Sequence, residues 1–130
     1  MSPRVLADDF ARAVAELKDA LGGNPKSRLE QAGCIQYFEF CFELAWKALK
    51  ALASYQGLSG ADSPRGALRA AFGQGWIDDE PVWLEMLEAR NRMSHTYSAE
   101  AALAIFGRLG AFLAAFVALE GQLRAIVPED

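Results

Sequence analysis

The sequence predicts an all-α protein whose simplest arrangement is an antiparallel up-down four-helix bundle with one extra short helix. Helix start and stop signals divide the 130 residues into five segments, nearly all of them rich in the helix-favouring residues Ala, Leu, Glu and Lys. No segment alternates apolar and polar residues as a strand does, and no internal repeat occurs. The length and the 52% hydrophobic composition predict a single domain over residues 1–130.

The first helix is expected to begin at Ser2 and Pro3. Proline is favoured at the first helical position because its missing N–H would have no partner there. The glycines at 22–23, followed by Pro25, should end this helix.

The second helix is predicted from a capping box of Ser27 and Glu30 and runs uninterrupted to Gly57. After its first turn, the polar residues of this helix form one narrow stripe, and the rest of its surface is apolar. A central helix of the bundle explains this pattern, and a homodimer that covers the remaining aromatic face is a second explanation. The stripe consists of Gln36, Glu39, Glu43, Lys47, Lys50 and Ser54.

The remaining three helices are predicted by a capping Ser or Asp with Pro or an acidic residue in the first turn. The third helix is short and ends near residues 73–75, and the fifth is one helix that ends before Pro128. They begin at Ser63 with Pro64, at Asp79 with Pro81, and at Ser98 with Glu100.

Charge and cysteine content exclude several classes of protein. A net charge of -4 argues against binding of nucleic acid over the whole surface, so any such contact must be a local site. One histidine without CxxC or HExxH predicts no metal site, and no cofactor is expected. Cys34 and Cys41 lie seven residues apart in one helix, too far to bridge, and are expected to be buried thiols.

Residues 101–119 are long and apolar enough to require a membrane test. The central Arg108 largely offsets the insertion energy of the apolar residues, so the sum is marginal. A recurring set of small residues in this region suits packing against another helix as well as it suits lipid. We expect no membrane span and, because the N-terminus lacks a signal-peptide pattern, a cytoplasmic protein.

Arg90 lies on an unexpected side of the fourth helix. At 100° per residue it falls in the middle of an apolar arc that includes Trp83, Met86 and Leu87. An unpaired guanidinium there would cost several kcal/mol, so Arg90 needs a carboxylate or a ligand anion. Glu39 or Glu43 of the second helix could pair with it, and such an ion pair could serve only to set helix register.

The lone histidine follows close behind. His95 lies near the expected end of the fourth helix, where the helix dipole favours the imidazolium and where capping alone could explain a histidine. Arg90 and His95 converge only if the helix ends or loosens near Ser94. An extended turn would then place His95 and Tyr97 on the same side, which would gather a cation, an acid/base group and a phenol.

The string RNRMSHTY (90–97) fits the Rx4HxY motif of the HEPN superfamily. FEFCFELAWKALK (38–50), DSPRGALRAAF (62–72) and WLEMLEARNRMSHTYS (83–98) resemble the nucleotidyltransferase substrate-binding protein family within it. The resemblance covers residues 5–120 and implies a dimeric HEPN-like bundle, encoded beside a minimal nucleotidyltransferase. In HepT-like members, the toxins of toxin–antitoxin pairs, it implies RNA cleavage without metal. The motif arginine and histidine cut the RNA, and the partner silences them by transferring AMP to the motif tyrosine.

Carried to this sequence, the resemblance implies that Arg90 and His95 are catalytic and that Tyr97 is the AMPylation site. Glu39, Glu43 and Asn91 are expected to support or pair with Arg90. Cleavage by the ribose 2'-OH needs a base, an acid and a cation, so a homodimer that brings two sets together would complete the site. The alternatives are a non-catalytic subunit that presents nucleotide or another substrate to the nucleotidyltransferase, and a purely structural dimeric bundle.

Overall fold

The computed structural model describes residues 1–95 and 98–129, with the backbone alone for His95. Within this part of the chain there are six helices and no strand, so the predicted all-α class is confirmed. The helices are α1 (Pro3–Gly22), α2 (Arg28–Tyr55), α3 (Pro64–Gln74), α4 (Glu80–His95), α5 (Ala99–Phe106) and α6 (Leu109–Ile126).

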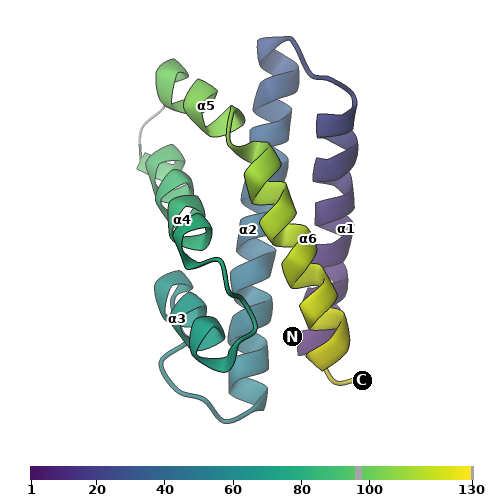
Figure 1. Ribbon diagram of the computed structural model, residues 1–130, viewed down its shortest axis with the longest axis vertical. Helices are drawn as coiled ribbons and strands as arrows, with labels where there is room; N and C mark the ends of the chain where they lie inside the picture. The colour runs from purple at the N-terminus through teal and green to yellow at the C-terminus, as the bar shows by residue number, and fades with distance from the viewer. Residues whose placement is uncertain (96–97, 130) are drawn as a thin grey trace.

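Four of the helices form an up-down-up-down bundle (Figure 1). α2 is its centre and contacts each of the other five helices, as the central-helix interpretation expected. α1 lies on one side of α2, α4 and the short α3 lie on the other, and α6 crosses in front (Figure 1). The predicted extra short helix is α3, and α5 covers the end of the bundle where α4 stops.

The capping signals formed as expected. The backbone N–H of Glu30 donates to Ser27 Oγ at 3.0 Å, and the Ser27 N–H donates to Glu30 Oε1 at 3.0 Å, which completes the capping box. The bonds that the backbone N–H groups of Ser27 and Lys26 donate to the carboxylate lower the pKa of Glu30. Side chains of Ser2, Ser63 and Ser98 accept N–H bonds at the starts of α1, α3 and α5. Local sequence therefore explains where these helices begin.

The predicted continuous fifth helix is wrong. The chain leaves the helix at residues 107–108, which separates α5 from α6. Gly107 is a weak helix former, and Arg108 Nε and Nη2 donate to Glu85 of α4 at 2.7 and 2.8 Å. The same guanidinium lies 5.8 Å from the centre of the Phe112 ring. This long-range pairing favours the break, and α5 turns to contact α2 and α4.

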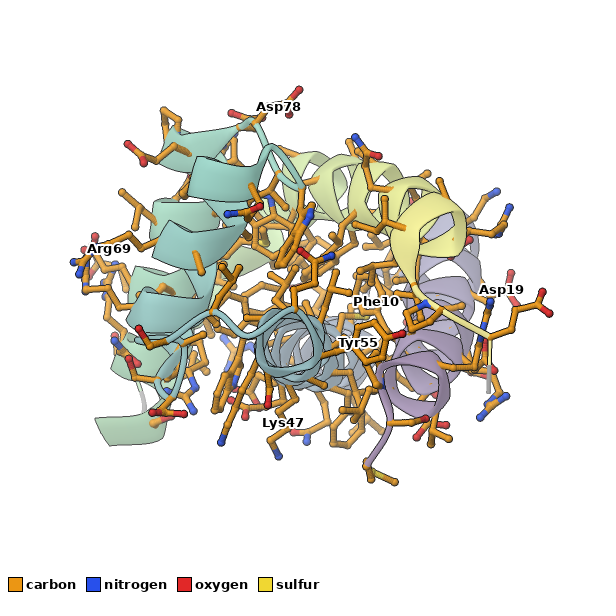
Figure 2. All side chains as sticks on the ribbon, turned by 90° about the horizontal axis from the view of Figure 1, so that it is seen from below. Phe10, Asp19, Lys47, Tyr55, Arg69 and Asp78 are labelled. Atoms are coloured by element: carbon orange, nitrogen blue, oxygen red, sulfur yellow. The ribbon has the colours of Figure 1, made fainter. Side chains whose placement is uncertain are left out.

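An aromatic cluster joins the four bundle helices at the core. Phe116 of α6 contacts the rings of Phe10 on α1, Phe38 on α2 and Trp83 on α4, with centroid distances of 5.8, 6.1 and 5.7 Å. All four side chains are buried, and Figure 2 shows Phe10 directed between the helices. Because each helix supplies a ring, the cluster ties the relative positions of α2 and α4 to the whole core.

Both cysteines are buried free thiols, as predicted. Burial raises the pKa of the Cys41 thiol to about 12, and burial also raises the pKa of Cys34. A thiol held in its neutral form is a poor nucleophile, so these residues act as packing groups within α2.

Among the described residues, α6 is the one helix that is long and apolar enough to cross a membrane. One side of α6 is buried against the bundle through residues such as Phe112, Phe116 and Leu119, as in the core helix of a folded domain. The apolar window 101–119 considered from the sequence is divided by the break at 107–108.

Candidate functional site

Arg90 of α4 is paired with Glu43 of α2. Arg90 Nε donates to Glu43 Oε1 at 2.8 Å, and Arg90 Nη2 lies 2.7 Å from the same oxygen. Glu43 is thus the carboxylate that Arg90 requires at its position on the apolar side of α4. The Arg90 and Glu43 side chains are 29% and 33% exposed, so this ion pair lies at the edge of the core and remains accessible from outside.

The second carboxylate oxygen of Glu43 is held by a residue that sequence reasoning did not single out. Trp46 Nε1 donates to Glu43 Oε2 at 3.0 Å. Trp46 belongs to the apolar surface of α2, and its spacing of three from Glu43 is the signal that could have revealed the contact, since such residues are neighbours on a helix. With one oxygen on Arg90 and the other on Trp46, Glu43 has little freedom to rotate.

Asn91 extends this network along α4. Arg90 Nη1 donates to Asn91 Oδ1 at 3.1 Å. A guanidinium has five N–H donors, and the contacts to Glu43 and Asn91 occupy three of them. Among the described residues, two N–H groups, one on each terminal nitrogen, are therefore left for another acceptor such as a phosphate oxygen.

Glu39, the other carboxylate expected near Arg90, lies one turn before Glu43 and is half-buried. Within the described residues it makes no ion pair with Arg90. Burial raises the pKa of Glu39, the negative charge of Glu43 raises it further, and Arg90 partly offsets both effects. The structure therefore distinguishes two carboxylates that the sequence left equivalent.

Replacement of Glu39 by glutamine should stabilise the protein modestly at pH 7. The raised pKa means that the folded state resists ionisation of Glu39. The charged carboxylate therefore lowers the stability of the fold at a pH above its pKa in the folded state. This cost disappears at a pH below its pKa in the unfolded chain, near 4.5. Thermal unfolding of wild type and Glu39→Gln at pH 7 and pH 4 measures this. The gain should shrink toward zero at pH 4, and an equal gain at both values would contradict the electrostatic cause.

The described end of α4 lies close to the break expected around Ser94. α4 is helical through His95, one residue beyond Ser94, and Ser94 Oγ donates to the Arg90 carbonyl at 3.0 Å inside the helix. Positions five apart on a helix are separated by about 140°. The His95 side chain and Tyr97 lie outside the described residues, so their convergence with Arg90 stays a prediction.

Two grooves flank the C-terminal half of α4. One, of about 500 Å³, lies between α2, α5 and Met93, with Glu39 on one wall and Leu103 and Phe106 on another. The other, of about 490 Å³, lies between α3, α4 and the start of α5, and Asn91 lines it. The Arg90 network therefore lies between two surfaces that could receive other molecules.

This arrangement can bind an anion without breaking the ion pair. Glu43, Trp46 and Asn91 fix the orientation of Arg90, and its remaining N–H groups can stabilise negative charge on a phosphate. Among the described residues no cluster of His, Cys, Asp and Glu could hold a metal ion. The network of Arg90, Glu43, Trp46 and Asn91 could supply a fixed cation, and an acid/base group would have to come from residues outside this network.

The family comparison gives a match over most of the chain. Residues 7–125 match the family described as nucleotidyltransferase substrate binding protein like. A Haemophilus influenzae protein named "Probable ribonuclease HepT" is 36% identical over 97 residues, which cover 72% of this chain. The same alignment covers 66% of that protein, so the chain matches slightly less than two thirds of its relative's length.

Two solved structures are similar to the bundle. A crystal structure of a protein from Thermus thermophilus has a TM-score of 0.79 at 36% identity and covers 88% of this chain and 98% of its own. A Haemophilus influenzae protein, described as revealing the fold of a substrate binding domain of a nucleotidyltransferase, has a TM-score of 0.66 at 29% identity. That match covers 94% of this chain and 96% of the other.

Proposed function

Since this chain belongs to the nucleotidyltransferase substrate binding protein like family, we propose that it is the helical partner of a minimal nucleotidyltransferase encoded nearby. We propose further that it is a cytoplasmic, HepT-like component of a toxin–antitoxin pair and cleaves RNA without metal. The similarity to a protein named as a probable ribonuclease supports the second part. The observation that carries the proposal is the accessible, fixed Arg90 in the C-terminal half of α4, five residues before His95.

In the proposed reaction the ribose 2'-oxygen attacks the adjacent phosphorus and the bond to the 5'-oxygen breaks. A base removes the 2'-proton, an acid protonates the leaving oxygen, and a cation stabilises the charged phosphorane. The products are a 2',3'-cyclic phosphate and a free 5'-hydroxyl. Arg90 supplies the cation through the N–H groups not used by Glu43 and Asn91, and His95 supplies proton transfer near neutral pH.

A homodimer would complete this site, because each chain has a single histidine. Exposed apolar side chains on the side of α2 that carries Glu43 support such an interface: Leu29 is 83% and Phe40 49% exposed. Leu103 of α5, 64% exposed, lines the adjoining groove. A second copy on this surface would bring two arginines and two histidines into one cleft.

One observation favours a different role for Arg90. The guanidinium is already neutralised by Glu43, as expected if the pair sets the register of α4 on α2. The bundle would then present nucleotide or another substrate to the nucleotidyltransferase without cutting RNA. The description of the Haemophilus influenzae structure as a substrate binding domain accords with this alternative.

The direct test is incubation of the purified, unmodified protein with RNA in the presence of EDTA. We expect cleavage products that end in a 2',3'-cyclic phosphate. Intact RNA after prolonged incubation with the folded, dimeric protein would contradict the nuclease proposal and leave the substrate-presenting role.

The partner proposal predicts a covalent mark. After co-expression with the adjacent nucleotidyltransferase, the intact mass of this chain should rise by one or more AMP units, and the increase should vanish in Tyr97→Phe. Tyr55 is 65% exposed and lies outside the motif, so Tyr55→Phe is the matched control and should keep the adducts. Unmodified protein beside a demonstrably active partner would exclude Tyr97 as the modification site.

A further inference from the structure

A second candidate site lies on the outer side of α4 and adjoins the Arg90–Glu43 pair through Asn91. α3, α4 and α5 follow one another along the same side of the bundle (Figure 1). Between them is the groove of about 490 Å³. Its polar lining consists of Arg65 from α3, of Glu88, Asn91 and Arg92 from α4, and of Ser98 at the start of α5. Three helices that are separate in sequence therefore supply the polar groups of one groove.

The groove has an excess of positive charge, although the whole chain has a net charge of -4. Arg65 and Arg92 face one carboxylate, Glu88. Among the described residues, the ion pairs involve other arginines, and neither Arg65 nor Arg92 takes part in one. Two guanidiniums across a groove are a suitable arrangement for a phosphate, which accepts N–H bonds from more than one direction.

The helix dipoles add to this arrangement. Ser98 caps the start of α5 and lines the groove together with Ala101, so the positive end of the α5 dipole faces the same space. Arg65 occupies the second position of α3, where the dipole disfavours a cation. The dipole of α3 therefore does not favour an arginine at this position, whereas an anion in the groove would.

Asn91 connects this groove with the candidate catalytic cation. Its Oδ1 accepts from Arg90 Nη1 at 3.1 Å, which leaves its amide N–H groups for other acceptors. The same side chain lines the groove. An anion bound between Arg65 and Arg92 would thus lie one side chain away from the network that orients Arg90.

From these contacts we propose that the groove is a subsite for a phosphodiester of an RNA strand, beside the phosphate that is cut. The proposal rests on the RNase function proposed above. Arg65 and Arg92 bind the phosphate oxygens, Asn91 and the start of α5 contribute weaker polar contacts, and Glu88 limits the affinity. The chain would then direct RNA to the site by local charge in spite of its acidic surface.

Binding of a fluorescent 2'-O-methyl RNA oligonucleotide, which cannot be cleaved, tests this in EDTA by fluorescence anisotropy. We expect Arg65→Gln and Arg92→Gln each to weaken binding by about three- to tenfold. Each should also reduce the steepness of the plot of log binding constant against log salt concentration by about 0.7. Glu88→Gln should tighten binding, because it removes the opposing charge. Arg69→Gln is the matched control, since Arg69 is also on α3 but points away from the bundle and does not line the groove (Figure 2).

Equal affinity of Arg65→Gln, Arg92→Gln and Arg69→Gln would overturn the subsite, as would wild-type protein that does not bind the oligonucleotide. Loss of ATP binding in the two groove variants with unchanged RNA binding would overturn the assignment to RNA. Cleavage of unmodified RNA, measured in parallel, separates the two proposals. Cleavage that persists without charge-dependent binding removes the subsite alone, and charge-dependent binding without cleavage removes the nuclease alone.

Discussion

RNA cleavage in EDTA should fall by about 10²–10⁴-fold in His95→Ala, the range expected when a general acid or base is removed. Arg90→Ala should lower the rate by about 10²–10³-fold, as for loss of a donor that stabilises the charge of a transition state. The measurement is the initial rate with a short RNA of defined sequence. Arg124→Ala is the control for loss of charge, because Arg124 is exposed on α6 and pairs locally with Glu120.

Stability separates this loss of activity from unfolding. The Arg90–Glu43 pair is about one third exposed, so its removal should cost about 1 kcal/mol, against about 5–15 kcal/mol for the unfolding of a typical domain. Arg90→Ala should therefore remain folded at 25 °C. If Arg90→Met keeps the full cleavage rate and raises the unfolding midpoint, the pair serves helix register and the catalytic role of Arg90 is wrong.

Arg90→Lys gives a second distinction. Lysine keeps the charge but loses the planar guanidinium that contacts Glu43 and Asn91 while it offers further N–H groups. We expect this variant to stay folded and to cleave RNA slowly. A rate equal to that of wild type would show that charge alone is sufficient and that the geometry of the network is not needed.

Phe116→Ala should destabilise the protein by about 3–5 kcal/mol, the largest effect that we expect from a single core substitution. The ring is fully buried and contacts aromatic residues from the other three bundle helices. Its removal leaves a cavity that those rings can fill only if the helices move closer together. The measurement is the free energy of unfolding from urea denaturation, monitored by helical circular dichroism.

Val117→Ala provides the matched control on the same turn of α6. Val117 is 48% exposed, so its truncation should change stability by about 0.5 kcal/mol or less. If Phe116→Ala and Val117→Ala have equal small effects, the aromatic cluster does not join the helices as the structure indicates.

Local signals were sufficient for most of the fold. Ser27 with Glu30, Ser63 with Pro64 and Ser98 each begin a helix where the capping pattern predicts one. Such caps bond to backbone N–H groups only three residues away, so they depend little on the rest of the structure. The apolar surface of α2 likewise indicated a central helix, because a helix at the edge of a small bundle could not bury so much apolar surface.

Long-range pairing could not be predicted in the same way. The break before α6 lies where Arg108 pairs with Glu85, and the sequence contains no local sign that these residues are neighbours. The choice between Glu39 and Glu43 as the partner of Arg90 was open for the same reason. Helical projection placed both on one stripe, and only the packing of α4 on α2 put Glu43 against the guanidinium.

By itself the sequence determined the helical class, the helix starts, and the need of Arg90 for an anion, because propensity, capping and periodicity act over a few residues. The tertiary structure alone decided which carboxylate meets that need, that Trp46 holds this carboxylate, and that Arg65 and Arg92 face one groove. These contacts join different helices, and the packing of large side chains such as Phe116 sets how those helices approach one another.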